Sequence, residues 1–110
     1  MTGLPRDFRL RKRKDYLRVQ GKSERSQSAH FILLAAKQPG SIEKKARLGI
    51  TASKKVGNAV ARNKVKRGIK EFFRMKREEL LAKDYVIVAR RGSALLRSRE
   101  MNKELDGLFR

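Results

Sequence analysis

Residues 53–77 limit what this chain can fold into, because they are at once strongly basic and regularly apolar. They hold ten lysines and arginines and one acid, Glu71. At about 100° per residue, the apolar side chains in and just after this stretch fall within one arc of about 160°. They are Ala61, Val65, Ile69, Phe72, Phe73, Met75 and Leu80. This spacing predicts one long helix with an apolar face that seals a core and an opposite face that carries a stripe of cations.

Three polar residues fall on the apolar side of this helix: Asn58, Arg62 and Lys76. Lys76 lies near the far end, where its long stem can carry the ammonium group out to water. A buried arginine without a partner is very costly, so we expect the start of the helix to be the rim of a groove rather than core. Gly57 and the uncapped amides of the first turn would add a partial positive charge suited to phosphate.

The charge balance points to a polyanionic partner. Thirty lysines and arginines against eleven acids give a net charge of +19, which favours nucleic acid first and an anionic membrane second. No segment approaches the roughly 20 apolar residues that a transmembrane helix needs, so we expect no membrane partner. The 39% hydrophobic content and the clear periodicity argue against a disordered basic tail.

Length and cysteine content bear on domain organisation and compartment. A chain of 110 residues predicts one domain, residues 1–110, with residues 1–7 loosely held because of Gly3 and Pro5. The start lacks the apolar region of a secretory signal. There is no cysteine, which excludes disulfides and thiolate metal sites and fits a reducing cytoplasm.

Shorter segments flank the basic helix. Phe8 and Leu10 alternate with arginines, as in an extended segment, and a short helix is predicted over residues 14–20. The polar residues 22–28 are irregular and include at most a short edge strand. The continuous apolar run over residues 30–36 favours a buried strand, although periodicity alone leaves a helix open. Residues 37–45 contain Pro39 and Gly40 and are predicted to be a hairpin connection to the next strand.

Two more strands and a final helix complete the pattern. Residues 47–52 alternate as a half-buried strand does, and residues 84–89 form a second strongly apolar strand. Gly92 and Ser93 are predicted to break this strand and cap a C-terminal helix. Its apolar positions are Ala94, Met101, Leu105 and Leu108.

A sequence signature stands at the start of the basic helix. The run Lys54-Lys55-Val56-Gly57-Asn58-Ala59-Val60, followed by Arg62-Asn63-Lys64 and Lys66-Arg67, resembles the signature of the bacterial ribonuclease P protein subunit. The family's usual Arg-Asn-Arg stands here as Arg62-Asn63-Lys64. The resemblance extends from about Phe8 to Phe109, in the order of elements as well as in the motif. A lone Arg-Asn pair would mean nothing, but so long a run of matching positions before a basic helix is specific.

The predicted order of helix, strands, helix, strand and helix indicates an α+β fold, or an α/β sandwich with helices against one central sheet. A strand–helix–strand connection is ordinarily right-handed. The resemblance implies a four-stranded mixed sheet, similar to the second domain of small-subunit ribosomal protein five, with an unusual left-handed crossover.

The acidic residues do not predict an autonomous nuclease. Two-metal hydrolysis needs several carboxylates at one site, whereas almost all acids here stand beside lysines or arginines, as charge balance on solvated faces. They are Asp7, Asp15, Glu24, Glu43, Glu71, Glu78, Glu79, Asp84, Glu100, Glu104 and Asp106. The single histidine, His30, starts a strand and is expected to be structural or to contact RNA. The resemblance implies that the RNA subunit performs the metal-dependent hydrolysis. The protein would help to bind precursor tRNA and productive magnesium ions, while holding no cofactor or metal alone.

The resemblance implies two surfaces that face RNA. The first docks the RNA subunit, through Lys54, Lys55, Asn58, Arg62, Asn63, Lys64, Lys66, Arg67 and Lys70. The second is a groove for the single-stranded 5′ leader of precursor tRNA, between the short first helix, the sheet and the start of the long helix. Its residues are Arg9, Arg13, Tyr16, Lys54, Arg62 and Asn63. Gln20 and Leu34 stand where some members carry aromatic residues, which predicts weaker base stacking in this groove.

Aromatic residues have a plainer interpretation as well. On a short helix Tyr16 is more often core than a stacking platform, although a place beside Arg9 and Arg13 suits a single strand. Phe31 and Phe72 are predicted to be core.

Two other classes of function remain open. A ribosomal or general RNA-binding structural protein would have the same basic charge and a small α+β fold. A helix-turn-helix DNA binder would need a short helix three or four residues before a recognition helix, but here the predicted strand over residues 47–52 precedes the basic helix.

Overall fold

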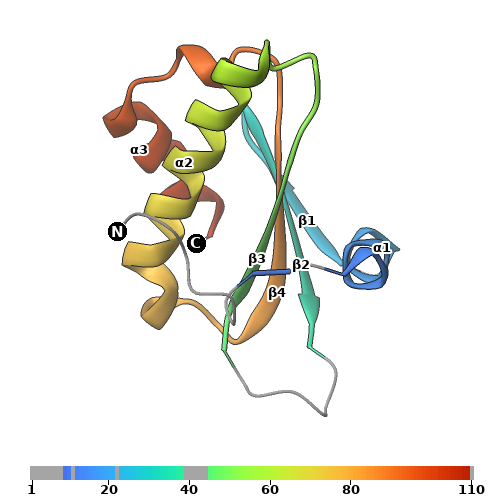
Figure 1. Cartoon of the computed structure of the whole chain (residues 1–110). Coiled ribbons are helices and arrows are strands. Elements are labelled where there is room, and N and C mark those ends of the chain that lie inside the picture. Colours follow the sequence, from blue (N-terminus) through green and yellow to red (C-terminus); the bar gives the residue numbers. More distant parts are fainter. Residues whose placement is uncertain (1–8, 11, 22, 39–44, 110) are drawn as a thin grey trace.

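Four strands form one mixed sheet, in which the last strand of the chain lies between the second and the third. The computed structural model describes residues 9–10, 12–21, 23–38 and 45–109. In chain order the elements are α1 (Arg13–Gly21), β1 (Glu24–Gln27), β2 (Phe31–Lys37), β3 (Arg47–Ala52), α2 (Ala59–Lys76), the short 3-10 turn η2 (Arg77–Glu79), β4 (Lys83–Ala89), a second 3-10 turn η3 (Ser93–Leu95) and α3 (Ser98–Leu108). The strand order is β1-β2-β4-β3. Helix α1 covers one face of the sheet, and α2 with α3 covers the other (Figure 1).

The central position of β4 overturns the predicted hairpin over residues 37–45. Strand β2 pairs with β4 in antiparallel register, and β3 pairs with β4 in parallel register, so β2 and β3 are not neighbours. The two most continuously apolar runs, β2 and β4, are the two central strands. Such strands are buried on both faces and gain most when each has a partner on both sides. The left hand of the β3–α2–β4 crossover stays a prediction of the resemblance.

Helix α2 begins later than the basic stretch, because Gly57 has a φ of 147° and Asn58 is the N-cap. Val65, Ile69, Phe72 and Phe73 are buried against the sheet, as the apolar arc predicts. Leu80 lies beyond the helix, after η2, yet still packs against the core.

The prediction for Met75 is wrong, because its side chain is 65% exposed. Met75 lies at the margin of the apolar arc, about 160° around the helix from Phe73. The core side of this turn is already taken by Phe72 and Phe73, which are both buried. Lys76 is about half exposed, with its Nζ atom 4.0 Å from Glu79 Oε2, as expected for a lysine that reaches water.

The C-terminal helix also begins later than predicted. Ser93 is fully buried and starts the turn η3, whereas α3 starts at Ser98 after the N-cap residue Arg97. The backbone N–H of Arg97 donates to the Glu100 carboxylate at 2.8 Å, which caps the helix from the third position. Met101, Leu105 and Leu108 are buried as the spacing predicts, while Ala94 belongs to η3.

Helix α1 closes a second, smaller core on the opposite face of the sheet. Its buried members are Leu10, Val19, Ala36 and Val86. Just before α1, Arg9 forms a parallel bridge with Leu48 along the outer edge of β3. Strand β1 is a short edge strand whose four residues are all exposed, as predicted. The predictions for residues 1–7, Phe8, Arg11, Lys22 and residues 39–44 lie outside the described residues.

Candidate nucleic-acid interface

A row of three cations runs along the side of α2 that faces the outer edge of β3. Arg62, Lys66 and Lys70 are spaced by four residues, which places them one above another on a helix. Lys66 and Lys70 line a pocket with Leu48 and Ile50 of β3. Arg62 is half-buried, and its Nε atom is buried without a hydrogen-bond partner. We call these three residues the edge row.

Other polar residues of α2 point elsewhere. Asn63 and Arg67 are exposed to solvent on the outer side of the helix. The Lys64 Nζ atom donates to the Ala94 carbonyl at 3.0 Å, so its ammonium group holds η3 against α2. Within the described residues, no carboxylate lies within ion-pair distance of the edge row or of Arg67. Their charges are therefore available to an external anion.

The turn before α2 carries Lys54 and Lys55, both exposed. Backbone bonds from Val56 N–H to Ser53 O and from Gly57 N–H to Lys54 O hold this turn in place. The expectation of uncapped amides is wrong for Ala61, because the Asn58 side chain accepts its N–H at 2.9 Å. Asn58 is thus the helix cap and is exposed to solvent, rather than projecting toward the sheet.

Two further arginines lie near this turn that sequence analysis did not single out. Ala52 pairs with Ala89 at the ends of the parallel strands β3 and β4. The residues that follow each strand therefore leave the sheet at the same end, which brings the exposed Arg90 and Arg91 to the end that carries Lys54. The sequence alone could not show that these two arginines lie near Lys54, because their position depends on the pairing of β3 with β4.

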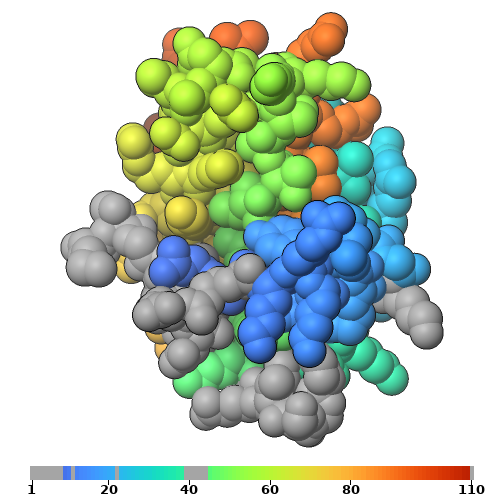
Figure 2. Space-filling view, turned by 45° about the vertical axis from the view of Figure 1, so that its right-hand side comes forward, coloured from blue at the N-terminus to red at the C-terminus, as the bar shows by residue number. Residues whose placement is uncertain are grey.

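A pocket of about 220 Å³ connects α1, the edge of β3 and the edge row. It is lined by Arg9, Leu10, Tyr16, Leu48, Ile50, Lys66 and Lys70. Figure 2 shows this side of the molecule, with α1 in blue next to β3 in green and α2 in yellow. The lining has three cations, one aromatic ring and no carboxylate, so it suits an anionic group beside a planar one. We call it the edge pocket.

Tyr16 is held in the edge pocket by a close approach to β3. A Cβ atom on Gly49 would lie 2.7 Å from the Tyr16 ring, so the ring rests directly on the glycine backbone. Tyr16 is half-buried. It is therefore neither a core residue nor a free platform: one part packs on the sheet, and another borders a cationic pocket.

The other residues predicted for the leader groove lie outside the lining of the edge pocket. Arg13 is the exposed first residue of α1, and Lys54 lies in the turn after β3. Arg62 and Asn63 belong to the first turns of α2, above Lys66. Gln20 is exposed on α1, whereas Leu34 is half-buried on the sheet face beneath that helix.

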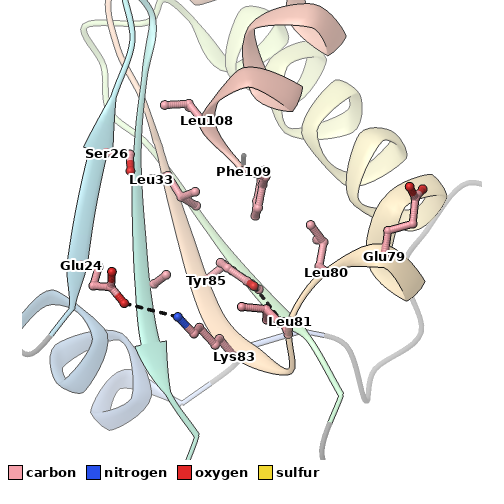
Figure 3. A pocket seen from close by; sticks show the side chains of 11 residues that line it. Glu24, Ser26, Leu33, Glu79, Leu80, Leu81, Lys83, Tyr85, Leu108 and Phe109 are labelled. Carbon is pink, nitrogen blue, oxygen red and sulfur yellow. Dashed lines mark hydrogen bonds and ion pairs between the residues drawn. The ribbon is translucent and has the colours of Figure 1, made fainter.

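A second pocket, of about 260 Å³, has the opposite chemical character. It lies between β1, η2, β4 and the end of α3, with Leu33, Tyr85, Leu108 and Phe109 among its apolar lining residues. Glu24 and Glu79 border it, and Glu24 pairs with Lys83 at 3.3 Å (Figure 3). Two carboxylates at its rim disfavour a polyanion, which leaves the edge pocket as the better place for nucleic acid.

The acids that the structure describes lie apart from one another or pair with basic side chains. No three of the described His, Cys, Asp and Glu residues are grouped so that they could hold a metal ion. His30 bonds through Nδ1 to Glu104 at 2.8 Å, which joins β2 to α3. Burial alone would raise the pKa of Glu104, but its hydrogen bonds from Ser28 and His30 lower it. The prediction of charge balance on solvated faces is wrong for Asp15 and Asp84, which are buried.

In the part of the chain that the structure describes, no helix is both long enough and apolar enough to cross a membrane. Phe31 and Phe72 are core residues, as predicted.

Comparisons with known proteins agree with one another. The family model described as Ribonuclease P matches residues 4–110. The ribonuclease P protein component of Desulforapulum autotrophicum is 40% identical over 107 residues, covering 96% of this chain and 89% of that protein. A solved structure of the Staphylococcus aureus RNase P protein is 33% identical, with a TM-score of 0.85, and covers 92% of this chain and 91% of its own. That of the Thermotoga maritima protein is 29% identical, with a TM-score of 0.81 and coverages of 92% and 94%.

Proposed function

Because the chain belongs to the bacterial ribonuclease P protein family, we propose that it is the protein subunit of a ribonucleoprotein that removes the 5′ leader from precursor tRNA. In this assembly the RNA subunit performs the hydrolysis, and the protein binds RNA. We expect it to act in the cytoplasm. The net charge of +19 supports this role, as do the edge row and Arg67, which have no carboxylate partner among the described residues.

We propose that the protein contributes no catalytic group of its own. The described carboxylates do not converge, and Asp84 and Glu104 are engaged by arginine, serine and histidine side chains. The residues that the structure describes therefore do not fit a protein-borne magnesium site. Magnesium would be held by the RNA subunit and the substrate. Purified protein, freed of RNA, should leave precursor tRNA intact, and 5′ processing by that preparation would contradict the proposal.

The exposed side of α2 is our candidate for docking the RNA subunit. Arg67 faces solvent, Lys54 and Lys55 extend the same charge before the helix, and Arg90 and Arg91 join them at the end of the sheet. Phosphate contacts of this kind give affinity and register without reading the base sequence.

The observation that carries the leader-binding proposal is the edge pocket. It combines Tyr16 with Arg9, Lys66 and Lys70 at one end of the groove expected from sequence. A single strand that enters it would place a phosphate among the cations and a base against the tyrosine ring. Mature tRNA lacks the leader and would gain nothing from these contacts.

The test compares precursor and mature tRNA on the assembled holoenzyme. Tyr16→Ala should weaken precursor binding by about 1–3 kcal/mol, the value of one stacked base, and leave mature tRNA unchanged. Leu17→Ala is the matched control, because Leu17 is 52% exposed on the same helix and outside the pocket lining. Equal losses for both tRNAs would mean damage to assembly, and no loss for either would make Tyr16 a packing residue only.

A general RNA-binding or ribosomal protein is the alternative function. It would share the charge and the fold but would not stimulate leader removal. Reconstitution with a bacterial ribonuclease P RNA, scored by 5′ leader release at low magnesium, separates the two. A helix-turn-helix reader is contradicted by the structure, because strand β3 and a turn precede α2, and α1 lies on the other face of the sheet.

A further inference from the structure

A buried carboxylate holds three elements together beneath α1. Asp84, near the start of β4, is fully buried and stands in register with Arg47 of β3 and Ala36 of β2. Arg47 donates to both carboxylate oxygens, through Nε to Oδ1 and through Nη2 to Oδ2, each at 2.7 Å. Gln38 adds a bond to Oδ1 at 3.2 Å.

Arg18 extends this network to α1. Its Nη2 group donates to Asp84 Oδ2, and its Nη1 group donates to the Lys37 carbonyl at the end of β2, at 2.7 Å. One turn earlier on α1, the Asp15 Oδ1 atom lies 3.5 Å from Arg18 Nη2 and 3.9 Å from Arg47 Nη2. One arginine of α1 is thus tied to two strands, and one arginine of β3 approaches α1.

The apolar contact of α1 with the sheet is small by comparison. The helix has nine residues, and only Asp15 and Val19 among them are buried. A helix this short is not stable alone, so its position depends on tertiary contacts. The charged bonds are directional, whereas the apolar contacts of α1, made by the buried Val19 and the half-buried Tyr16, fix the position of the helix less strictly.

These anchors lie next to the residue that borders the edge pocket. Tyr16 is two residues before Arg18 on α1, and Gly49, on which its ring rests, is two residues after Arg47 on β3. A shift of α1 along the sheet would therefore move the tyrosine ring relative to Lys66 and Lys70.

We propose that Arg18, Asp84 and Arg47 form a clamp that positions Tyr16 for the leader strand, so that Arg18 is a positioning residue for precursor recognition. This rests on the proposed function, because it assumes that the leader reaches the edge pocket. The clamp touches no RNA. It acts only by fixing where α1 lies.

The experiment replaces Arg18 and measures the dissociation constants of precursor and mature tRNA on the holoenzyme. Arg18→Gln should weaken precursor binding about 5-fold or more, the lower value for one stacked base converted to a ratio. Mature tRNA should bind as before. Lys14→Gln is the matched control, since it removes the same charge from the exposed side of the same helix. Equal losses in the two variants would reduce Arg18 to a general electrostatic contribution and overturn the clamp.

A double-variant cycle with Tyr16→Ala separates positioning from simple destabilisation. If Arg18 acts through the tyrosine ring, Arg18→Gln should cost nothing further in precursor preference once Tyr16 is alanine. Arg18→Lys, which keeps the charge but cannot make both bonds, should recover only part of the preference. Additive losses would overturn the clamp while leaving the leader contact intact. A harmless Tyr16→Ala would instead overturn the proposed leader contact itself, and the clamp with it.

Discussion

Removing the charge of Asp84 is the sharpest test of how this fold is held together. In Asp84→Asn the side chain keeps its shape and one acceptor oxygen but loses its negative charge. Arg47 would then stand with most of its side chain buried, and among its described partners only the more distant Asp15 carboxylate, with Oδ1 3.9 Å from Arg47 Nη2, would still carry a counter-charge. Breaking a buried ion pair from one side costs about 3–5 kcal/mol.

The size of the effect follows from chain length. We take the lower value, about 3 kcal/mol, because asparagine retains one acceptor. At roughly 2.1 cal/mol/K per residue, 110 residues give an unfolding entropy of about 230 cal/mol/K. The melting temperature should therefore fall by about 13 °C. A domain of this size has about 5–15 kcal/mol to lose, so the variant should still fold at low temperature.

The pH dependence adds a second signature. Burial alone would raise the pKa of Asp84, but hydrogen bonds from Arg47 and Arg18 outweigh it and hold the pKa below its usual value. Because the pKa of Asp84 is lower in the folded protein than in the unfolded chain, its charge contributes fully to the free energy of unfolding above the unfolded-state pKa, near 3.9. This contribution is lost as the pH falls through the folded-state pKa. The gap in stability between wild type and Asp84→Asn should shrink below about pH 4.

Thermal unfolding followed by circular dichroism checks both points. Glu71→Gln is the control, because it removes a carboxylate from an exposed pair with Arg74 and should leave the midpoint nearly unchanged. An Asp84→Asn midpoint that matches this control, or a stability gap that does not narrow in acid, would refute the reasoning.

The remaining predictions address binding, packing and the α3 anchor. Replacing Lys55 and Arg67 together with alanine should flatten the slope of log affinity for the RNA subunit against log salt by about one to two units; an unchanged slope would place the RNA surface elsewhere. Gly49→Ala should push the Tyr16 ring away, cost about 1–3 kcal/mol in stability and lower precursor preference in the tRNA binding assay, whereas an unaltered preference would show that the ring position is unimportant. Glu104→Gln should lower stability by about 1–3 kcal/mol, and the loss should fade in acid because the pKa of Glu104 is lowered; a constant loss down to pH 3 would argue against that charge.

Local sequence patterns predicted most of the helices and strands. The apolar arc predicted the buried face of α2, and the apolar runs predicted β2, β3 and β4 within one or two residues. The predictions were wrong where the structure depends on contacts between segments that are far apart in the sequence. Nothing near residues 37–45 indicates that β4 will separate β2 from β3, because that pairing joins segments some 50 residues apart. The prediction that Met75 is buried was wrong because Phe72 and Phe73 already fill the core at that turn of α2.

The residues of the candidate site likewise fall into those that local sequence patterns predicted and those whose position depends on distant contacts. The basic residues of α2 were visible because a helix brings them together by its own spacing. The meeting of Tyr16 with Lys66 and Lys70 required the edge of β3 between them, which the sequence does not place. Asp84 was misjudged as surface charge balance for a related reason. Its partner Arg47 lies 37 residues away, and only the parallel β3–β4 register aligns the two.

The clamp also bears on how a chain with a net charge of +19 can present cations to RNA without losing its shape. Asp84 pairs with two arginines, Arg18 and Arg47. These two cations are therefore not free to bind RNA, and their bonds to Asp84 fix the position of α1 on the sheet. A buried ion pair adds little net stability compared with apolar packing of the same volume, but its hydrogen bonds are directional and form only when the partners lie in defined positions. An apolar contact of equal area would hold α1 to the sheet as firmly yet define its position less sharply. For a helix whose proposed task is to present one ring to a strand, defined position is the property that matters.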